Sequence, residues 1–250
     1  YLKRLITSLV LENDISQAVN IIKINSKNDN TNFFEAYILL ALDSLKKNNI
    51  EKAKDILDNV PENLQKDNFE FVILNSLKQF IAVFQTREVK KDFQNFGNLS
   101  LISETFQRCY LDDEKTGSFF SKLVNNVQSD YSRYIYFYLT YLIDKNQIKE
   151  AKDITNEIDY INTTLLLSQG KSWIEKNEFN EFSKVFSCSN KNDILAEFLF
   201  IISNLYSSQD EFKKSNFYLS LSYYLNPRFV FNLSLVAENF YLNKDYNKSK

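Results

Sequence analysis

The chain of 250 residues contains no histidine and only three glycines, two prolines and two cysteines. Without histidine it cannot supply a Ser–His triad, a Cys–His dyad, or a histidine ligand for zinc or haem. β-Sandwiches, β-barrels and nucleotide-binding sheets need many glycine and proline turns, so the scarcity of both favours an all-α chain. The isolated glycines also form no phosphate-binding loop, and we expect no cofactor and no catalytic site.

The two cysteines, Cys109 and Cys188, are too few for a disulfide framework. They fall in different expected repeats, so we expect both to be small buried core residues. No hydrophobic run approaches the ~18 residues needed to span a membrane. The sequence starts at Tyr1 with no visible signal peptide. Its compartment, cytoplasmic or periplasmic, therefore stays open, since a targeting segment can precede it.

The formal net charge is −2, and lysine outnumbers arginine 25 to 5. A nucleic-acid surface is basic and clustered, and arginine is the better residue for bidentate phosphate contacts. We therefore expect no nucleic-acid partner. Hydrophobic residues make up 44% of the chain and aromatic residues 15%, which is ample apolar surface for a folded core.

One pattern of large, small and aromatic residues occurs twice near the C-terminus, 34 residues apart. Leu199, Ser203, Tyr206 and Ser215 are followed at that interval by Leu233, Ala237, Phe240 and Ser249. The spacing, with Pro227 after the first unit, is typical of a two-helix repeat.

A shorter motif, polar–large–x–x–small, recurs along the whole chain. It occupies Asp14–Ala18, Asn49–Ala53, Gln147–Ala151, Glu178–Phe182, Glu211–Ser215 and Asp245–Ser249. The last residues are 35, 98, 31, 33 and 34 apart. Because 98 divides into three intervals of similar length, we expect two degenerate units between Ala53 and Ala151.

These motifs resemble the tetratricopeptide (TPR) repeat family. The resemblance implies an all-α, right-handed α-solenoid of about seven helical hairpins and a partial eighth. It covers residues 1–250 as a single array, with TPR-like repeats over 1–64, degenerate hairpins over 65–131 and clearer repeats over 132–250. In such hairpins each unit packs only on its neighbours.

Small residues in TPR-like hairpins let the two helices approach closely where they cross. The first-helix small positions are Ala41, Gly170, Ser203 and Ala237. We expect Ser203 and Ser215 to face each other within one hairpin. Leu139 and Phe182 replace small residues and interrupt the pattern.

The degenerate section keeps helical periodicity. Apolar residues from Phe69 to Phe84 predict one helix, and Val89, Phe93 and Phe96 predict a shorter one that stops at Gly97. A third helix is expected from Asn98 to Cys109 or Tyr110. Asp112 and Asp113 are expected to cap a fourth. We interpret the Asp112–Glu114 cluster as a helix start rather than a metal site, and Trp173 as a core residue.

The TPR resemblance implies a protein-interaction scaffold, expected to be bacterial, that holds an extended peptide or a helix in a concave groove. The groove is formed mainly by the first helix of each hairpin. The chain lacks the Lys and Asn pair with which some TPR domains hold a C-terminal carboxylate. The predicted groove residues, by unit, are Arg133, Tyr136 and Thr140; Thr164, Leu167 and Lys171; Glu197, Phe200 and Asn204; and Phe231, Ser234, Glu238 and Tyr241.

The partner is therefore expected to be a protein or peptide. An alternative hypothesis is that the chain is the helical arm of a larger enzyme, for example one acting on cell walls, whose catalytic domain lies outside these residues.

Overall fold

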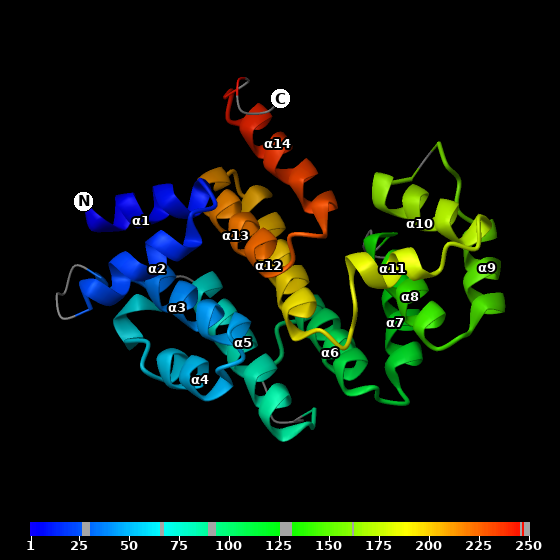
Figure 1. Cartoon of the computed structure of the whole chain (residues 1–250), viewed down its shortest axis with the longest axis horizontal. Helices are drawn as coiled ribbons and strands as arrows, with labels where there is room; N and C mark the ends of the chain where they lie inside the picture. The colour runs from blue at the N-terminus through cyan, green and yellow to red at the C-terminus, as the bar shows by residue number, and fades with distance from the viewer. Residues whose placement is uncertain are drawn as a thin grey trace. The chain divides into compact units, whose positions relative to one another are not determined.

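The computed structural model of the chain describes residues 1–26, 31–65, 68–89, 94–125, 132–161, 163–245 and 247. Throughout these residues the regular elements are fourteen α-helices and two short 3-10 helices, with no strand (Figure 1). The prediction of an all-α chain is confirmed. No described helix combines the length and the apolar character needed to cross a membrane.

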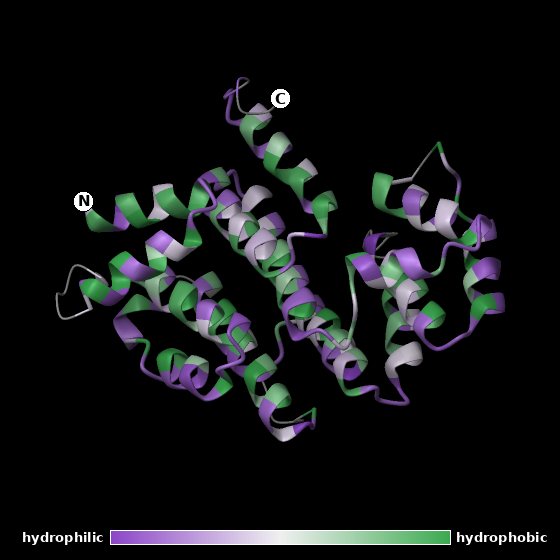
Figure 2. Ribbon diagram, in the orientation of Figure 1, coloured by the Kyte–Doolittle hydropathy of each residue, from purple (hydrophilic) through white to green (hydrophobic). Residues whose placement is uncertain are grey.

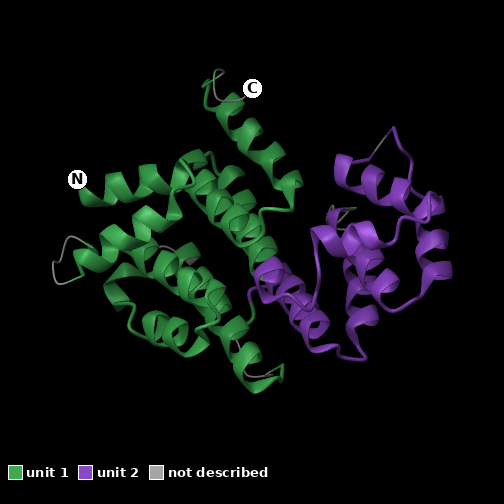
Figure 3. Cartoon of the chain, in the orientation of Figure 1, with its two compact units in different colours: residues 1–95, 195–250 green, residues 96–194 purple. Residues whose placement is uncertain are grey.

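The chain divides into two compact units, residues 1–95 with 195–250 (unit 1) and residues 96–194 (unit 2) (Figure 3). Unit 1 contains α1 (Leu2–Leu11), α2 (Ile15–Ile24), α3 (Phe34–Lys46), α4 (Ile50–Asp58), η2 (Glu62–Leu64), α5 (Asn68–Thr86), α13 (Phe212–Leu225), η3 (Val230–Asn232) and α14 (Leu233–Leu242). Unit 2 contains α6 (Asn98–Leu111), α7 (Thr116–Val124), α8 (Ser132–Asp144), α9 (Ile148–Asn156), α10 (Leu165–Glu175) and α11 (Asn180–Val185). The helix α12 (Lys191–Ser207) begins in unit 2 and continues into unit 1.

Most helices carry both hydrophobic and hydrophilic residues along their length (Figure 2). Helix α4 is a clear case, because Ala53 and Leu57 are fully buried while Lys54 and Asp58 are exposed. The three- and four-residue spacing places the buried pair and the exposed pair on different faces. Burial of one face is the main source of stability for helices this short.

A single turn geometry ends the first helix of every complete hairpin in the described chain. At each turn one residue has a left-handed backbone, and the amide of the next residue donates to the carbonyl oxygen five residues earlier. The left-handed residues are Asn13, Asn48, Asp112, Asn146, Asn177 and Asp210, and Lys244 repeats the geometry after α14. The seven amide-to-carbonyl distances lie between 2.7 and 3.0 Å. This is a Schellman termination, which normally uses glycine. Asparagine and aspartate also tolerate the left-handed region, and they occupy six of these seven positions in a chain with three glycines.

At every turn except that of Asp112, the residue after the left-handed position is the first residue of the polar–large–x–x–small motif. In the two N-terminal hairpins its side chain also caps the second helix: Asp14 accepts from the amide of Gln17 and Asn49 from that of Lys52, each at 3.1 Å. The motif is therefore a helix-start signal for α2, α4, α9 and α13. The last copy cannot be followed beyond its turn, because Ser249 lies outside the described residues.

The hairpin α6–α7 has the same turn, although its sequence does not match the full motif. Gly117 stands four residues after Asp113, as the small residue does in the other motifs, and lies 64 residues from Ala53 and 34 from Ala151. Asp112 and Asp113 were expected to cap α7, and neither is its N-cap residue. Asp112 ends α6, and Asp113 accepts from the amide of Lys115, the residue before α7.

The other half of the degenerate section departs from expectation. The predicted helix over Phe69–Phe84 is confirmed by α5. The shorter helix predicted from Val89 to Gly97 is wrong for residues 89 and 94–96, which are not helical, and Phe93 lies outside the described residues. The described chain therefore holds six complete hairpins, with α5 and α14 as additional helices.

Buried small residues allow the helices of a hairpin to meet. Ser203 of α12 and Ser215 of α13 are both fully buried, and their hydroxyl oxygens lie 2.8 Å apart, as predicted. In the α10–α11 hairpin Phe182 replaces the small residue of the second helix. A Cβ atom added at Gly170 would lie 3.1 Å from the Tyr136 ring and 3.6 Å from the Phe182 ring, so the tight contact at this glycine is with Tyr136.

Unit 1 brings helices from opposite ends of the sequence together. Helices α1 and α3 both contact α13. The ammonium of Lys46 donates to the backbone oxygen of Tyr224 and lies 3.6 Å from the centroid of its ring. The expectation that each hairpin packs only on its sequence neighbours therefore does not hold in unit 1.

A charged cluster joins α2, α3 and α13 at this contact. The Asp43 carboxylate accepts from Lys47 at 2.7 Å, from Lys23 at 3.3 Å and from the hydroxyl of Tyr224 at 3.1 Å. Burial alone would raise the pKa of Asp43, but the hydrogen bonds from both lysines outweigh it and hold that pKa below its usual range. Burial and the neighbouring Asp43, to which the hydroxyl donates, raise the pKa of Tyr224 to about 12.

Unit 2 has an aromatic core centred on Phe106. Its ring centroid lies between 5.2 and 6.2 Å from those of Phe120, Tyr134, Phe137 and Phe186. These residues come from α6, α7, α8 and the C-terminal end of α11. Edge-to-face and tilted packing of this kind adds to the free energy gained from burial.

The cysteines of unit 2 are joined to each other. Cys109 of α6 and Cys188, in the segment between α11 and α12, form a disulfide with Cα atoms 5.4 Å apart. The expectation that both are small buried core residues is confirmed, but the bond between them was not predicted. The two expected repeats lie far apart in sequence, and only the folding of α11 back onto α8 and α6 brings the cysteines within bonding distance.

Candidate functional site

Four of the predicted groove residues are part of the core instead. Tyr136 and Thr140 are fully buried, and Leu167 and Glu197 are each 2% exposed. Assigning them to a groove was wrong. Tyr136 and Thr140 lie on α8, and Leu167 lies on α10, which packs against α8. Because α8 contacts α7, α9, α10 and α11, the face of α8 that is turned away from its hairpin partner is covered as well.

The other predicted groove residues lie at least partly at the surface. In unit 2, Arg133 and Lys171 are half-buried, and the Lys171 ammonium donates to the backbone oxygen of Ile158 at 2.6 Å. Thr164 is exposed and caps α10. In unit 1, Phe200 and Phe231 are half-buried, whereas Asn204, Ser234, Glu238 and Tyr241 are exposed.

Trp173, expected in the core, is half-buried. Its ring lies 5.3 Å from that of Phe182 and 6.5 Å from that of Tyr136. Of the cysteine and acidic residues in the described ranges, no three or more are arranged to hold a metal ion.

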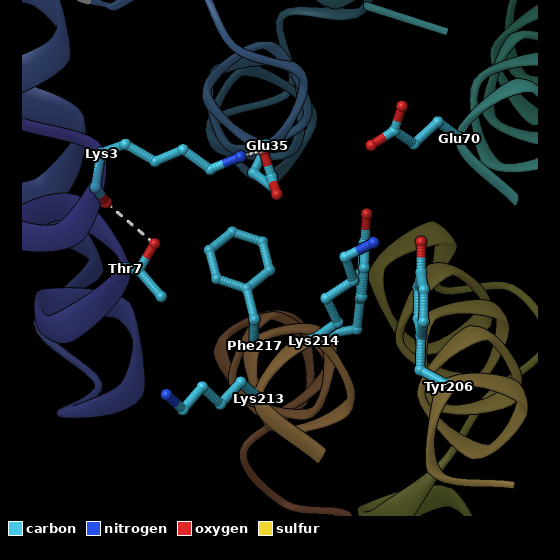
Figure 4. Close-up of a pocket in the computed structure, with 9 residues that line it drawn as sticks. Lys3, Thr7, Glu35, Glu70, Tyr206, Lys213, Lys214 and Phe217 are labelled. Carbon is cyan, nitrogen blue, oxygen red and sulfur yellow. Dashed lines mark hydrogen bonds and ion pairs between the residues drawn. The ribbon is translucent and has the colours of Figure 1, made fainter. Parts of the chain in front are cut away.

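Unit 1 contains a cavity of about 220 Å³ between α1, α3, α5, α12 and α13. Side chains from all five helices converge on it (Figure 4). Helices α1, α3 and α5 contribute Lys3, Thr7, Glu35 and Glu70. Helices α12 and α13 contribute Tyr206, Lys213, Lys214, Phe217 and Tyr218. The cavity exists because α1 and α3 pack on α13.

The aromatic side of the cavity is rigidly packed. The rings of Tyr206 and Tyr218 are stacked, with centroids 5.5 Å apart and planes within 5° of parallel. Phe69 of α5 packs on the same Tyr206 ring at 5.2 Å. Burial raises the pKa of Tyr218 well above its ordinary value, and the nearby Tyr206 and the carboxylates of Glu35 and Glu70 raise it further.

The polar side of the cavity carries charges of both signs. Lys3 and Glu35 form an ion pair at 3.0 Å, with the Glu35 side chain only 14% exposed. The ammonium of Lys214 lies 5.2 Å from the centroid of the Tyr206 ring, within the range of a cation–π interaction. The low exposure of Glu35 strengthens its pairing with Lys3 relative to a fully exposed ion pair.

No local sequence signal marks this cavity. Its residues come from both ends of the chain, and Lys3 and Lys214 are more than 200 positions apart. Lys213 and Lys214 are ordinary members of the repeat motif that opens α13, and only the contact between distant helices makes them part of a cavity.

Comparison with known proteins gives no relative from which a role could be transferred: no family model, no curated protein and no solved structure matches the chain.

Proposed function

We propose that this chain is a tetratricopeptide-like helical repeat protein that binds a peptide segment of a partner protein and catalyses no reaction. A right-handed superhelical succession of the hairpins is part of this proposal. The observation that carries it is the reuse of one Schellman turn at seven helix ends, six of which lead into the second helix of a hairpin after three or four residues. Repetition of one supersecondary unit is the signature of helical repeat proteins, whose common role is to present an extended binding surface.

The cavity of unit 1 supports a binding role. It combines stacked aromatic rings with charged groups of both signs, and aromatic residues are the usual anchors of protein interfaces. The surrounding helices fix the walls, so little ordering would be required on binding.

The proposal can be tested with a phage library of random 12-residue peptides selected on the immobilised chain. We expect enriched families that share a motif, whose synthetic members bind one per chain with dissociation constants in the micromolar range or tighter. Mass spectrometry should recover each bound peptide unaltered. Failure to enrich any family over a blank surface would contradict peptide binding, and cleavage or modification of the bound peptide would contradict a non-catalytic role.

A further inference from the structure

The cavity of unit 1 is too small for a typical cofactor. Its volume of about 220 Å³ is below the ~300–1,000 Å³ of most small-molecule sites. A space of this size suits one or two residues of a peptide. Figure 4 shows the Phe217 ring at the centre of the surrounding side chains, where an inserted apolar group would contact it.

The charge of the cavity selects between ligands. Three lysines, Lys3, Lys213 and Lys214, line it with two glutamates, Glu35 and Glu70, which leaves one net positive charge. A cationic ligand would meet three ammonium groups and would compete with Lys214 for the face of Tyr206. A carboxylate would instead be attracted, because the net charge is of opposite sign.

Lys213 is the group best placed to receive that carboxylate. Its side chain is exposed, and it forms no ion pair with any residue that the structure describes. Lys3, by contrast, is already paired with Glu35. A ligand with its carboxylate at Lys213 would have its apolar part near Phe217, four residues further along α13 and therefore on the same face of the helix.

We propose that this cavity binds an apolar or aromatic group that carries, or directly adjoins, a carboxylate. The proposal rests on the peptide-binding function above and names the anchor of the bound peptide. Two peptide sources share this chemistry: an aromatic residue next to an aspartate or glutamate, and an apolar residue at the C-terminus of a chain.

Three small probes of similar shape test the charge preference by NMR titration of the whole chain: 3-phenylpropionate, its neutral amide and 2-phenylethylamine. We expect the carboxylate to shift the resonances of Tyr206 and Phe217 and to bind at least threefold more tightly than the amide. The amine should bind most weakly. Tighter binding of the amine, or no binding by any probe, would overturn the proposal.

The charge-reversed variant Lys213→Glu should weaken binding of 3-phenylpropionate at least fivefold while leaving the amide unaffected. The matched control is Lys176→Glu, which makes the same charge change at an exposed position in unit 2. An equal loss in both variants would show a general charge effect and would overturn the assignment to the cavity.

The peptides Ac-Phe-Asp-NH2 and Ac-Ala-Phe-OH then distinguish the two sources, with Ac-Ala-Phe-NH2 as the uncharged control. Binding of either charged peptide above the control supports the proposal, and binding of neither overturns it. Library peptides that bind the parent and Lys213→Glu equally would leave the proposed peptide-binding function intact and remove only this cavity as its site.

A second inference rests on the disulfide alone. Cys109 and Cys188 are the two cysteines of the chain; both are buried, and neither is free. Stable disulfides form in oxidising compartments and are rare in the cytosol, where thiols are kept reduced. We infer that this protein works in an oxidising compartment.

Thiol trapping in the native cell tests this inference. Cells are quenched in acid, free thiols are blocked with N-ethylmaleimide under denaturing conditions, and the two cysteine peptides are analysed by mass spectrometry. We expect the two cysteine peptides to be joined by the disulfide and to carry no N-ethylmaleimide, and to be labelled by a second alkylating reagent only after reduction. Blocked cysteines in the unreduced sample would overturn the inference.

Discussion

The hydroxyl oxygen of Ser203 lies 2.8 Å from that of Ser215, in the buried space where α12 crosses α13. The Ser203 hydroxyl also lies 2.8 Å from the backbone oxygen of Ser215. Asn239 of α14 extends the contact, since its amide donates to the Ser215 hydroxyl at 2.7 Å and to the side-chain oxygen of Asn216 at the same distance. Buried polar side chains therefore join three successive helices: Ser203 of α12, Ser215 and Asn216 of α13, and Asn239 of α14.

Replacing either serine by leucine should destabilise unit 1. Ser203→Leu or Ser215→Leu would overpack the crossing and remove these hydrogen bonds, at a cost of about 1–3 kcal/mol. Lys213→Leu, at an exposed position of α13, should stay within about 0.5 kcal/mol of the parent. Urea unfolding measures all three, and equal midpoints for the parent and the serine variants would contradict the close crossing.

The disulfide should stabilise unit 2. It links residues 79 positions apart, and such a bond typically contributes about 2–5 kcal/mol by restricting the unfolded chain. Dithiothreitol should therefore lower the thermal midpoint of the parent. The double variant Cys109→Ala/Cys188→Ala should already have the lower midpoint and should not respond to the reductant. A response of the double variant, or none by the parent, would argue against the bond.

Asp43 should make the stability of unit 1 depend on acid pH. Its pKa is lowered in the folded state, so its contribution is fully present above the unfolded pKa of about 3.9 and is lost as the pH falls through the lower, folded value. Asp43→Asn should cost about 1–3 kcal/mol at pH 7, because Lys23, Lys47 and Tyr224 lose a charged acceptor. The difference from the parent should shrink below about pH 4.

Asp58→Asn is the matched control for this experiment. Asp58 also accepts from two lysines, Lys54 at 2.9 Å and Lys78 at 3.1 Å, but its side chain is 43% exposed, against 5% for Asp43. Exposed ion pairs are worth about 0–1 kcal/mol. Urea unfolding at pH 7, 5 and 3 should therefore show a smaller effect for this variant, and equal effects would contradict the role given to burial.

Two glycines should respond to substitution in opposite directions. A Cβ atom at Gly117 would meet Tyr141 at 3.6 Å, an ordinary contact, so Gly117→Ala should stabilise α7 by about 0.4–1 kcal/mol. At Gly170 the same atom would lie 3.1 Å from the Tyr136 ring, and Gly170→Leu should cost about 1–3 kcal/mol or more. Thermal unfolding separates the two, and destabilisation by Gly117→Ala would contradict the spacing described around α7.

The buried Tyr136 and the exposed Tyr241 allow a test of which predicted groove residues belong to the core. Tyr136→Ala should cost about 3–5 kcal/mol, as removal of a large buried aromatic does, whereas Tyr241→Ala, at a residue that is 62% exposed, should change stability by less than about 0.5 kcal/mol. Both residues were expected in one groove, so similar small effects in urea unfolding would restore that expectation.

The sequence by itself determined where the hairpins turn. Each turn depends on residues that are close in sequence, such as the left-handed Asn13, the Asp14 cap and the buried Ala18. A short linear motif is therefore enough to predict it. The motif is incomplete at α6–α7, where Gly117 alone matches the small position. The turn geometry is nevertheless the same as in the other hairpins, because Asp112 also adopts a left-handed backbone.

Only the tertiary structure decided which helix faces are covered. Tyr136 and Phe200 occupy equivalent places in their repeats, but α8 is enclosed by four helices and Tyr136 is buried, whereas Phe200 is only half-buried. The Cys109–Cys188 bond and the cavity beside Phe217 have the same origin. Burial and pairing at these places depend on contacts between segments that lie from tens to about 200 residues apart, and a motif of a few residues does not encode such contacts.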